Sequence, residues 1–518
     1  MAQFLKNLLL KTLSRNLDNI AISIGNESLT YYQLFHPVLE FNKSLDFNMN
    51  NEEAMGVLAD KSIVGFQCIS SALLSGKSYV PLNIKYPVKR NASIIQQSGV
   101  KTLLVDSNCK TIALEIYIFL NKSIKLIILD RAEDGSITYI SVLPENKTST
   151  DIKLGLDIAY LLFTSGSTGT PKGVPISDKN IENYLYNISL NYDFSPKDRF
   201  SQFFDFTFDL SLHDILVCWK HGACLCPAKK QELLFPLHFA KKQSITVWFS
   251  VPSLAISAKD LMRKKFVDYR IENIKYSFFC GEALSNQLAK EWHTITNKSP
   301  VINLYGPTEA TIAFTAFKYS QSSNFIDANV VPIGKAMGNN KCQVMKDDAS
   351  ICNIEEKGEL CLSGKQVFDG YIEKNIKTKE TFHYQKSSTG EIMKWYRTGD
   401  IVSIQKNGCL IYYGRNDRQV QVKGFRVELQ EVEHVIRTIL STSRLAVIAY
   451  PINNIGEAKG LSLFISNNDN SSNIIDKCQN LLPHYMVPDN IIILKRFPFN
   501  SNGKLDYKKL IEIAKKQS

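Results

Sequence analysis

The segment at residues 164–173, Thr-Ser-Gly-Ser-Thr-Gly-Thr-Pro-Lys-Gly, combines the residue types that bind phosphate. Its glycines let the backbone approach an anion closely, and its hydroxyl and backbone N–H groups can donate hydrogen bonds to phosphate oxygens. It lacks the Gly-Lys-Ser/Thr of a Walker loop, and Pro171 and Pro175 oppose a helix directly after it. We therefore expect a strand, a loop and a second strand. The expected nucleotide contacts are Thr164, Ser165, Gly166, Ser167, Thr168, Gly169 and Lys172.

A second motif, Tyr-Gly-Pro-Thr-Glu-Ala-Thr at residues 305–311, offers groups for the rest of a nucleotide. Tyr305, next to Gly306, can stack on a purine. Thr308 can donate to a phosphate, and Glu309 can hold the Mg²⁺ that a nucleoside triphosphate carries, because hard cations prefer oxygen ligands. We therefore expect Thr308 and Glu309 to be catalytic.

Two further motifs each contribute one charged residue to the expected site. Asp400, at the end of Tyr-Arg-Thr-Gly-Asp, suits the two hydroxyls of a ribose, and Arg415 supplies a cation nearby. Lys504, in Asn-Gly-Lys-Leu-Asp, can stabilise a carboxylate and an α-phosphate during reaction. Each motif alone could arise by chance. The four in this order predict ATP-dependent activation of a carboxylate.

The elements that position these motifs alternate between apolar strand-like runs and helical patterns through the first four fifths of the chain. This alternation favours an α/β fold with largely buried sheets. A helical pattern at residues 180–189 has Ser177 or Asp178 as its expected N-cap. The strand-like runs include 102–105, 126–130, 159–163 and 245–249.

The pattern changes near Gly408, where a strand at 409–414 is followed by a polar stretch and by an amphipathic helix at 428–439. We therefore place a domain joint at 414–417. It separates a large domain, residues 1–414, from a small α+β domain, residues 415–518.

Composition excludes several classes of protein. The net charge of +11 is dispersed, which favours a solvated surface or the steering of an acidic protein partner over nucleic-acid binding. The sequence contains no uninterrupted run of about 18 apolar residues, so we expect no membrane span. The N-terminal residues predict an amphipathic helix, with a transit peptide as the alternative. Eleven cysteines without a C-x-x-C pair indicate reduced thiols in a cytoplasm. A monomer is the default expectation.

Taken together, the motifs resemble the adenylate-forming superfamily of acyl- and aryl-CoA synthetases, luciferases and amino-acid adenylation domains. Within it the chain is most similar to D-alanine–D-alanyl carrier protein ligases and nonribosomal peptide synthetase adenylation domains. The resemblance runs from Ser28 to Asp506. It implies ATP and Mg²⁺ as cofactors, a large N-terminal domain of several subdomains and a small mobile C-terminal lid.

The resemblance also assigns roles to particular residues. Asp417 matches the hinge about which the lid turns. Lys504 would face the carboxylate while an aminoacyl adenylate forms, and Lys423 with Gly424 would turn inward when a thiol attacks it. The wall of the adenine site would consist of Gly281, Glu282, Ala283 and Asn303.

The resemblance further implies an amino-acid substrate. Asp209 matches the carboxylate that pairs with the substrate ammonium, although it could instead cap a helix. The expected pocket is narrow and favours alanine, D-alanine, serine, glycine or proline. His213 and Leu304 depart from the D-alanine ligases, and His213 either meets a polar substrate group or supports the pocket from behind. The expected lining is Leu210, His213, Phe249, Phe278, Cys280, Leu304, Ile312 and Ala313.

The thiol acceptor is expected in trans, as a separate phosphopantetheinyl carrier protein, because no Gly-Gly-x-Ser carrier signature follows Asp506. Two alternatives stay open. One is an acyl- or aryl-CoA ligase acting on a carboxylate that is not an amino acid, against which Asp209 argues. The other is a binding protein built on an inactive adenylation fold, against which the complete set of motifs argues.

Overall fold

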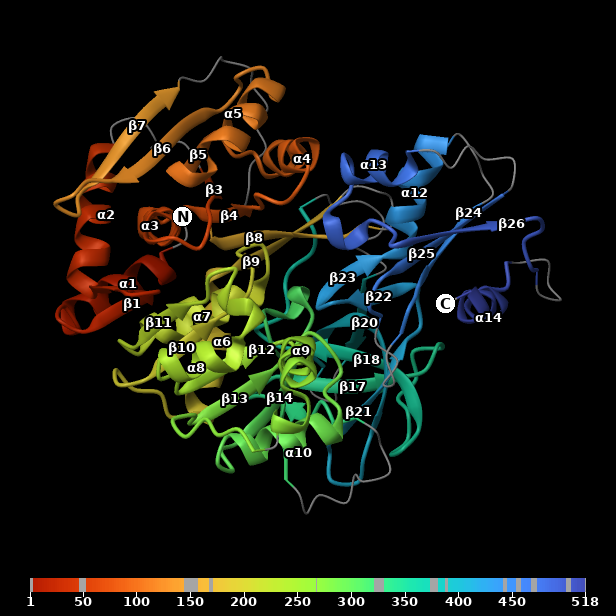
Figure 1. Cartoon of the computed structure of the whole chain (residues 1–518). Helices are drawn as coiled ribbons and strands as arrows, with labels where there is room; N and C mark the ends of the chain where they lie inside the picture. The colour runs from red at the N-terminus through yellow and green to blue at the C-terminus, as the bar shows by residue number, and fades with distance from the viewer. Residues whose placement is uncertain are drawn as a thin grey trace.

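Figure 1 shows the computed structural model of the chain, in which several α/β layers form a large body and a smaller lobe lies beside it. The structure describes residues 3–45, 53–143, 157–166, 171–266, 268–320, 330–372, 381–386, 390–440, 445–452, 458–466, 473–499 and 505–517.

A seven-stranded sheet organises the N-terminal part. Four neighbouring pairs of its strands are parallel, and each edge strand is antiparallel to its neighbour. Its inner strands are almost continuously apolar and buried, as is typical of a sheet covered on both faces. In spatial order the strands are β7 (Ile137–Leu143), β6 (Lys125–Arg131), β5 (Thr102–Asp106), β3 (Ala54–Leu58), β4 (Ser78–Leu82), β8 (Ile158–Thr164) and β9 (Lys172–Ser177). The helices that follow its strands are α3 (Ile63–Ser75), α4 (Val88–Ser98) and α5 (Lys110–Phe119).

A nine-stranded sheet forms the second layer. Its central strands are parallel, and the carboxyl ends of three of them lead into the motifs of the site. In spatial order the strands are β16 (Lys335–Ala336), β15 (Thr315–Lys318), β14 (Val301–Tyr305), β13 (Tyr276–Phe279), β12 (Val247–Ser250), β10 (Arg199–Gln202), β11 (Cys224–Pro227), β1 (Ile20–Ile24) and β2 (Glu27–Thr30). The helices of this part of the chain are α1 (Phe4–Arg15), α2 (Tyr31–Leu45), α6 (Asp178–Asn191), α7 (Asp209–Lys220), α8 (Pro236–Lys242), α9 (Pro252–Met262) and α10 (Asn286–Ile295).

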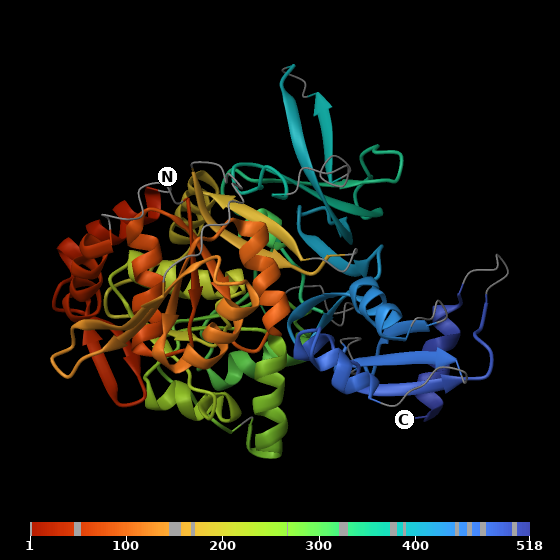
Figure 2. The ribbon, with the colours of Figure 1, turned by 90° about the horizontal axis from the view of Figure 1, so that it is seen from above.

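A five-stranded antiparallel sheet follows, and Figure 2 shows part of it projecting from the body. Its last strand ends at Arg415, inside the stretch where the sequence predicts the domain joint. The strands are β17 (Lys341–Met345), β18 (Lys357–Ser363), β20 (Ile392–Ile404), β19 (Phe382–Lys386) and β21 (Leu410–Arg415).

The C-terminal lobe is α+β, as the sequence predicts. A hairpin of β22 (Gln419–Val422) and β23 (Phe425–Glu428) enters it, and a three-stranded sheet forms its centre. Its packing continues that of the large body, because one buried cluster contains Leu161 of β8 together with Val422 and Val427. The remaining elements are α12 (Leu429–Leu440), β24 (Leu445–Ala449), β25 (Leu461–Ser466), α13 (Ile474–Gln479), β26 (Asn490–Leu494) and α14 (Tyr507–Gln517).

Most predicted elements are present within one or two residues. The Ser177 side chain caps α6 by accepting a hydrogen bond from Asn180 N, so Ser177 is the N-cap of the two residues that the sequence offers. The N-terminal amphipathic helix is α1, which buries Leu5 and Leu9. The strand predicted at 245–249 begins only at Val247, because the amide of Ile245 donates to Ala240 at the end of α8. Within the described ranges, none of the helices has both the length and the apolar character to cross a bilayer.

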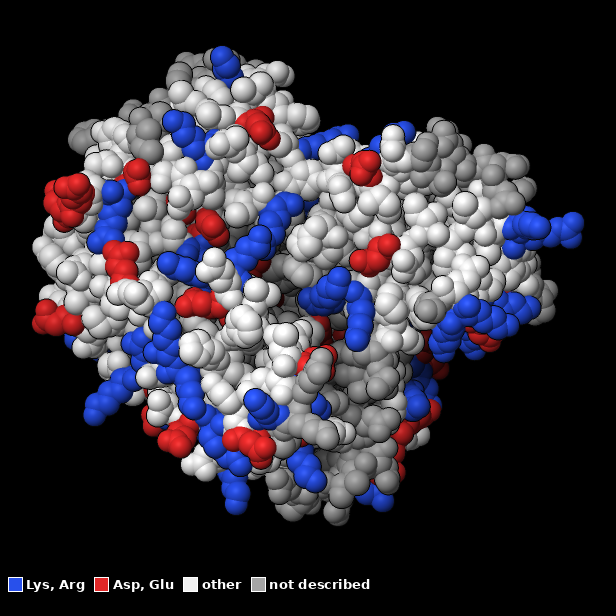
Figure 3. Space-filling view, in the orientation of Figure 1, with Lys and Arg blue, Asp and Glu red and all other residues white. Residues whose placement is uncertain are grey.

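The charges of the surface are dispersed. Figure 3 shows basic side chains scattered over one face and interspersed with acidic ones. The distribution agrees with the interpretation of the +11 charge as a solvated surface. All eleven cysteines are free thiols, and most are buried.

Candidate active site

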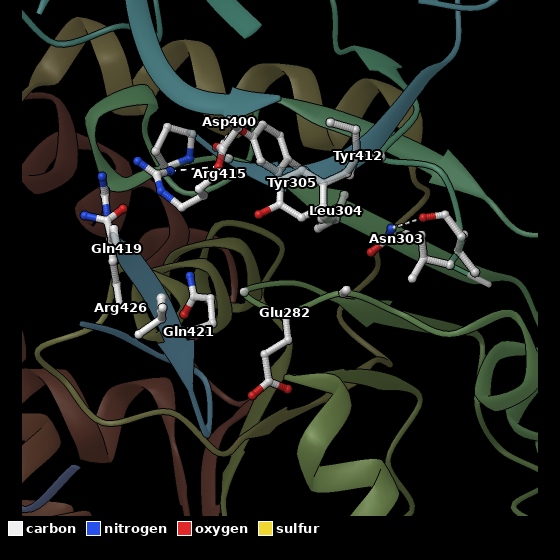
Figure 4. A pocket seen from close by; sticks show the side chains of 18 residues that line it. Glu282, Asn303, Leu304, Tyr305, Asp400, Tyr412, Arg415, Gln419, Gln421 and Arg426 are labelled. Carbon is white, nitrogen blue, oxygen red and sulfur yellow. Dashed lines mark hydrogen bonds and ion pairs between the residues drawn. The ribbon is translucent and has the colours of Figure 1, made fainter. Parts of the chain in front are cut away.

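A cavity at the carboxyl end of β14, called here the Tyr305 cavity, encloses about 120 Å³ (Figure 4). Gly281, Glu282, Ala283, Asn303 and Gly306 line it, as expected for an adenine site. The Asn303 amide donates to the carbonyls of Val331 and Pro332, at 3.2 and 3.0 Å. The carboxylate of Glu282 points away from the cavity and accepts a hydrogen bond from Ser253 N at 2.7 Å. Glu282 therefore borders the cavity with its backbone.

At one end of the Tyr305 cavity, Asp400 accepts hydrogen bonds on both oxygens. The Tyr305 hydroxyl donates to Oδ2 at 2.5 Å, and Arg415 donates to Oδ1 at 2.7 Å. Burial raises the pKa of Asp400, although the charge of Arg415 opposes the shift. Arg415 also makes a two-point ion pair with Asp417, at 2.8 and 2.7 Å. The expected ribose site and the expected hinge residue are therefore joined through one guanidinium.

The segment at residues 164–173, which the sequence predicts to bind phosphate, has the predicted strands on both sides. Strands β8 and β9 are antiparallel, with Thr164 opposite Lys172. The described loop residues contact the C-terminal lobe: Ser165 Oγ donates to the Arg426 carbonyl at 3.1 Å, and Gly166 N donates to Glu431 Oε2 at 3.0 Å. Ser167, Thr168 and Gly169 lie outside the described residues.

Lys172 continues the same contact between the lobes, since its Nζ lies 3.7 Å from Glu428 Oε1. Glu431 is also paired with Arg90 at 2.6 Å, and both side chains of that pair are buried. Carboxylates of the C-terminal lobe thus face the groups with which the loop would bind phosphate.

Glu309 is buried at the start of the short helix η5 (Thr308–Ala310). The Tyr371 hydroxyl donates to its Oε1 and Arg426 to its Oε2, both at 2.8 Å. Burial alone would raise the pKa of Glu309, but the charge of Arg426 and the hydrogen bonds hold it below its ordinary value. The carboxylate is ionised and fully paired.

A carboxylate oxygen is a ligand that Mg²⁺ prefers, so Glu309 fits the metal that the sequence predicts. Arg426 occupies the same carboxylate, and the metal fits only when this side chain withdraws. Among the described residues, no group of three or more His, Cys, Asp or Glu side chains is arranged around a common metal site.

A second cavity of about 100 Å³, called here the Asp209 cavity, lies next to the first. Asp209 is the first residue of α7, and Phe208 is the N-cap, so Asp209 does not cap this helix. Its Oδ2 is buried and has no hydrogen-bond partner among the described residues. Burial raises the pKa of Asp209 to about 7, while a hydrogen bond from Thr308 acts in the opposite direction. Among the residues that the structure describes, none forms an ion pair with Asp209, and a buried carboxylate without a cation is costly.

The structure divides the expected substrate residues into three groups. Leu210 and Cys280 line the Asp209 cavity together with Thr308 and Gly306. Leu304 lines the Tyr305 cavity instead. The others are buried but do not border the Asp209 cavity, and they are His213, Phe249, Phe278, Ile312 and Ala313.

The turn at Lys423 and Gly424 joins β22 to β23 and enters the Asp209 cavity. Both residues have positive φ, 52° and 84°, as the two-residue hairpin turns that suit twisted strands require. A Cβ on Gly424 would lie 3.0 Å from Val251 Cγ1, so only glycine fits closely here. Phe425 then stacks on Tyr485, with ring centroids 4.0 Å apart. The turn is thus held beside Asp209. Lys504 lies outside the described residues.

Comparison with known proteins agrees with this geometry. A family model described as AMP-binding enzyme matches residues 10–372. The chain belongs to the AMP-binding enzyme family. It is 31% identical over 449 residues to the D-alanine–D-alanyl carrier protein ligase of Bacillus cytotoxicus, covering 84% of each chain. Zwittermicin A synthase ZmaJ of Bacillus cereus is 29% identical over 524 residues, 98% of this chain and 95% of that one.

Among solved structures, the AMP-binding enzyme resembles the Vibrio cholerae adenylation domain AlmE in complex with glycyl-adenosine-5′-phosphate. The TM-score is 0.87 at 27% identity, with 99% of this chain and 98% of that chain covered. Against tyrocidine synthase 1 of Brevibacillus parabrevis the identity is 28%, and the chain spans 44% of that protein. This AMP-binding enzyme is therefore an adenylate-forming enzyme related to peptide synthetase adenylation domains and to D-alanine–D-alanyl carrier protein ligase.

Sequence reasoning missed several residues that shape the site of this AMP-binding enzyme. Gln366 donates to the Ala313 carbonyl at 2.9 Å, next to Thr311 and Ile312, which both have positive φ. Positive φ is costly for a β-branched residue, so the loop needs such support. Tyr371 binds Glu309 from the segment after β18. Neither Gln366 nor Tyr371 stands in a motif, and no local pattern signals them.

Proposed function

We propose that the protein activates a small amino acid as its aminoacyl adenylate and transfers it to the thiol of a separate phosphopantetheinyl carrier protein. The observation that supports an amino acid is the unpaired Oδ2 of Asp209 at the wall of a small cavity. A substrate ammonium supplies the missing cation. A carboxylic acid without an amino group would leave this buried carboxylate unpaired.

The first half-reaction forms the adenylate. A carboxylate oxygen of the amino acid attacks the α-phosphorus of ATP, a new P–O bond forms, and the bond to the leaving pyrophosphate breaks. Asp209 holds the ammonium, Asp400 holds the ribose, and Thr308 and the loop at 164–173 hold phosphate oxygens. Mg²⁺ at Glu309, when bound, neutralises the charge on the phosphates. Lys504 stabilises the reacting carboxylate and α-phosphate.

The second half-reaction transfers the acyl group. The thiol sulfur attacks the acyl carbonyl carbon, the bond to AMP breaks, AMP leaves, and the thiol proton passes to solvent. The turn at Lys423 and Gly424 lies beside Asp209, where it can guide the thiol. We propose that the described arrangement is the one for this step, with residues 415–518 as the moving lid and Asp417 as its hinge.

The cysteines bear on the cellular compartment of the protein. Eleven free thiols suit a reducing compartment, so we propose the cytoplasm. We also propose a monomer that meets its carrier protein in trans.

Loading of the acceptor tests this function. Radiolabelled alanine and glycine, ATP and Mg²⁺ are supplied with a carrier protein in its phosphopantetheinylated form, in its unmodified form, or with coenzyme A in its place. We expect a labelled thioester only on the modified carrier. Label on coenzyme A alone would contradict the carrier-dependent function and favour a CoA ligase.

A further inference from the structure

The side chain of Gln366 is buried at the centre of a hydrogen-bonded network that lies behind the two cavities rather than in their lining. Its Nε2 donates to the carbonyls of Ala313 at 2.9 Å and Ala310 at 3.3 Å. Its Oε1 accepts from the side-chain amides of Asn340 at 2.7 Å and Asn187 at 2.9 Å. Both polar atoms of this amide are paired, and the network ties α6 to the segment that follows β18.

The loop that Gln366 contacts, residues 309–313, has an unfavourable backbone conformation. Thr311 and Ile312 both have positive φ, 62° and 69°, which β-branched residues rarely adopt. Such a conformation persists only where the surrounding contacts impose it. A further bond comes from the loop itself, because the Thr311 hydroxyl donates to the Gln366 carbonyl at 2.6 Å. Gln366 therefore holds this loop with both its side chain and its backbone.

The loop at 309–313 supports a wall that the two cavities share. Gly306 and Pro307 line both the Tyr305 cavity and the Asp209 cavity. A Cβ on Gly306 would lie 2.7 Å from the Cα of Ala313, so the loop is in direct contact with this wall. The amide of Ala310 also donates to the Pro307 carbonyl at 2.8 Å. A shift of the loop would therefore move the wall.

Both ends of the loop meet residues of the expected site. Burial is the main cause that raises the pKa of Asp209, and a backbone hydrogen bond from Ile312 acts in the opposite direction. A donor at this place stabilises the ionised carboxylate that would pair with an ammonium. At the other end, the carbonyl of Glu309 accepts from the amide of Phe368 at 2.9 Å. The segment that contains Gln366 and Phe368 thus contacts the loop at both ends.

We propose that Gln366 is a positioning residue for the amino-acid site. It holds the loop at 309–313 in its unfavourable conformation, and the loop in turn places the shared wall and the backbone of Ile312 next to Asp209. This inference rests on the proposed function. A purely structural role would lower the stability of the protein and leave recognition of the amino group unchanged.

Equilibrium binding of non-hydrolysable adenylate analogues tests this role without turnover. Calorimetry compares the glycyl and alanyl analogues with the acetyl and propionyl analogues, which lack only the amino group, and with AMP. Gln366→Leu keeps most of the side-chain volume and removes the amide. We expect the preference for the analogues with an amino group to fall by about 10-fold, the scale for losing a group that orients a binding residue. The Kd for AMP should stay nearly constant.

Gln243→Leu is the matched control for this variant. Gln243 is also buried, and it links Gly25 O at 3.0 Å to the Arg199 guanidinium at 2.9 Å, away from both cavities. Its replacement should lower the melting temperature without changing the preference for an amino group. An unchanged preference in Gln366→Leu, or an equal loss in both variants, would overturn the positioning role. Equal binding of both kinds of analogue by the unmodified enzyme would contradict the proposed function instead.

Thr311→Val keeps the proposal testable if Gln366→Leu does not fold. It removes the hydroxyl that donates to the Gln366 carbonyl and keeps the shape of the side chain. We expect the preference for an amino group to fall by about 3-fold, the scale of one hydrogen bond. Thr296→Val is its control, because it removes a buried hydroxyl that donates to Trp292 O at 2.8 Å. A preference that stays unchanged in Thr311→Val, or falls equally in Thr296→Val, would overturn the proposal.

Discussion

The guanidinium of Arg426 donates to Oε2 of Glu309 at 2.8 Å, across the boundary between the C-terminal lobe and the large body. Tyr371 takes the other oxygen of the same carboxylate. Glu309 is the residue expected to hold Mg²⁺, so the metal and Arg426 compete for one group. We therefore propose that this arrangement suits the step after pyrophosphate has left, and that Arg426 withdraws for adenylate formation.

Replacing Arg426 should separate the two half-reactions. Arg426→Gln leaves Glu309 buried without its cation in the described arrangement, and breaking a buried pair costs several kcal/mol. We expect transfer from preformed adenylate to slow by about 100-fold, with exchange nearly unchanged, as measured in single-turnover experiments. Arg437→Gln is the control, because Arg437 makes a more exposed pair with Glu433 at 3.3 Å in the same lobe. Equal losses in both half-reactions would contradict the competition.

Removing the contact between Glu431 and the loop at residues 164–173 should also slow the transfer step. Glu431 accepts from Gly166 N and pairs with Arg90, so it links the loop to the C-terminal lobe. We expect Glu431→Gln and Arg90→Met each to slow transfer by about 10-fold. The double variant should be non-additive by about 1 kcal/mol, because contacting residues couple. Full additivity of the two effects would show that the pair does not hold the lobes together.

Asp209 should make the stability of the folded protein depend on pH. Its pKa of about 7 lies far above the ordinary value of 3.8, so the folded protein binds an extra proton between these values. Ionising this buried carboxylate is unfavourable in the folded protein. The free energy of unfolding therefore falls as the pH rises from 3.8 to about 7. We expect Asp209→Asn to melt at a higher temperature than the unmodified protein at pH 8, with the difference vanishing near pH 4.

The same carboxyl group should control substrate binding. Below pH 7 it is protonated and cannot pair with an ammonium, so kcat/KM for the amino acid should fall by about 10-fold per pH unit. The KM for ATP should change little over this range. Asp209→Asn should lose amino-acid-dependent exchange at all pH values while still binding ATP. Retained amino-acid turnover in this variant would remove the ammonium role from Asp209.

Lys504 should matter in only one half-reaction. Lys504→Ala removes one stabilising group of the transition state, which usually costs about 10²- to 10³-fold. We expect this loss in pyrophosphate exchange and little change in transfer from preformed adenylate. Lys508→Ala is the control, because Lys508 is an exposed lysine of α14. A similar loss in both steps for Lys504→Ala would contradict the model of two lid orientations.

The sequence predicts the parts of this site whose cause is local. Glycines and prolines disfavour a helix at residues 164–173, and the two strands that flank this segment pair with Thr164 opposite Lys172. The N-cap at Ser177 follows from its hydroxyl in the same way. The alternation of apolar runs likewise predicts an α/β fold with largely buried sheets.

The contacts between the lobes could not be predicted in this way. Arg426 and Glu309 are 117 residues apart, and Gly166 and Glu431 are 265 apart, so neither pair leaves a periodic or short-range pattern. These contacts depend on how the C-terminal lobe packs against the large body. For the same reason the sequence counts His213 among the pocket residues but gives no sign of its bond to Tyr184.

Amino-acid-dependent ATP–pyrophosphate exchange tests the central claim most directly. Glycine, L-alanine and D-alanine would be compared with acetate and propionate, which lack only the amino group. The account predicts exchange with at least one of the amino acids and none above background with the matched acids. Exchange with propionate equal to that with alanine, or no exchange with any of the amino acids, would contradict it.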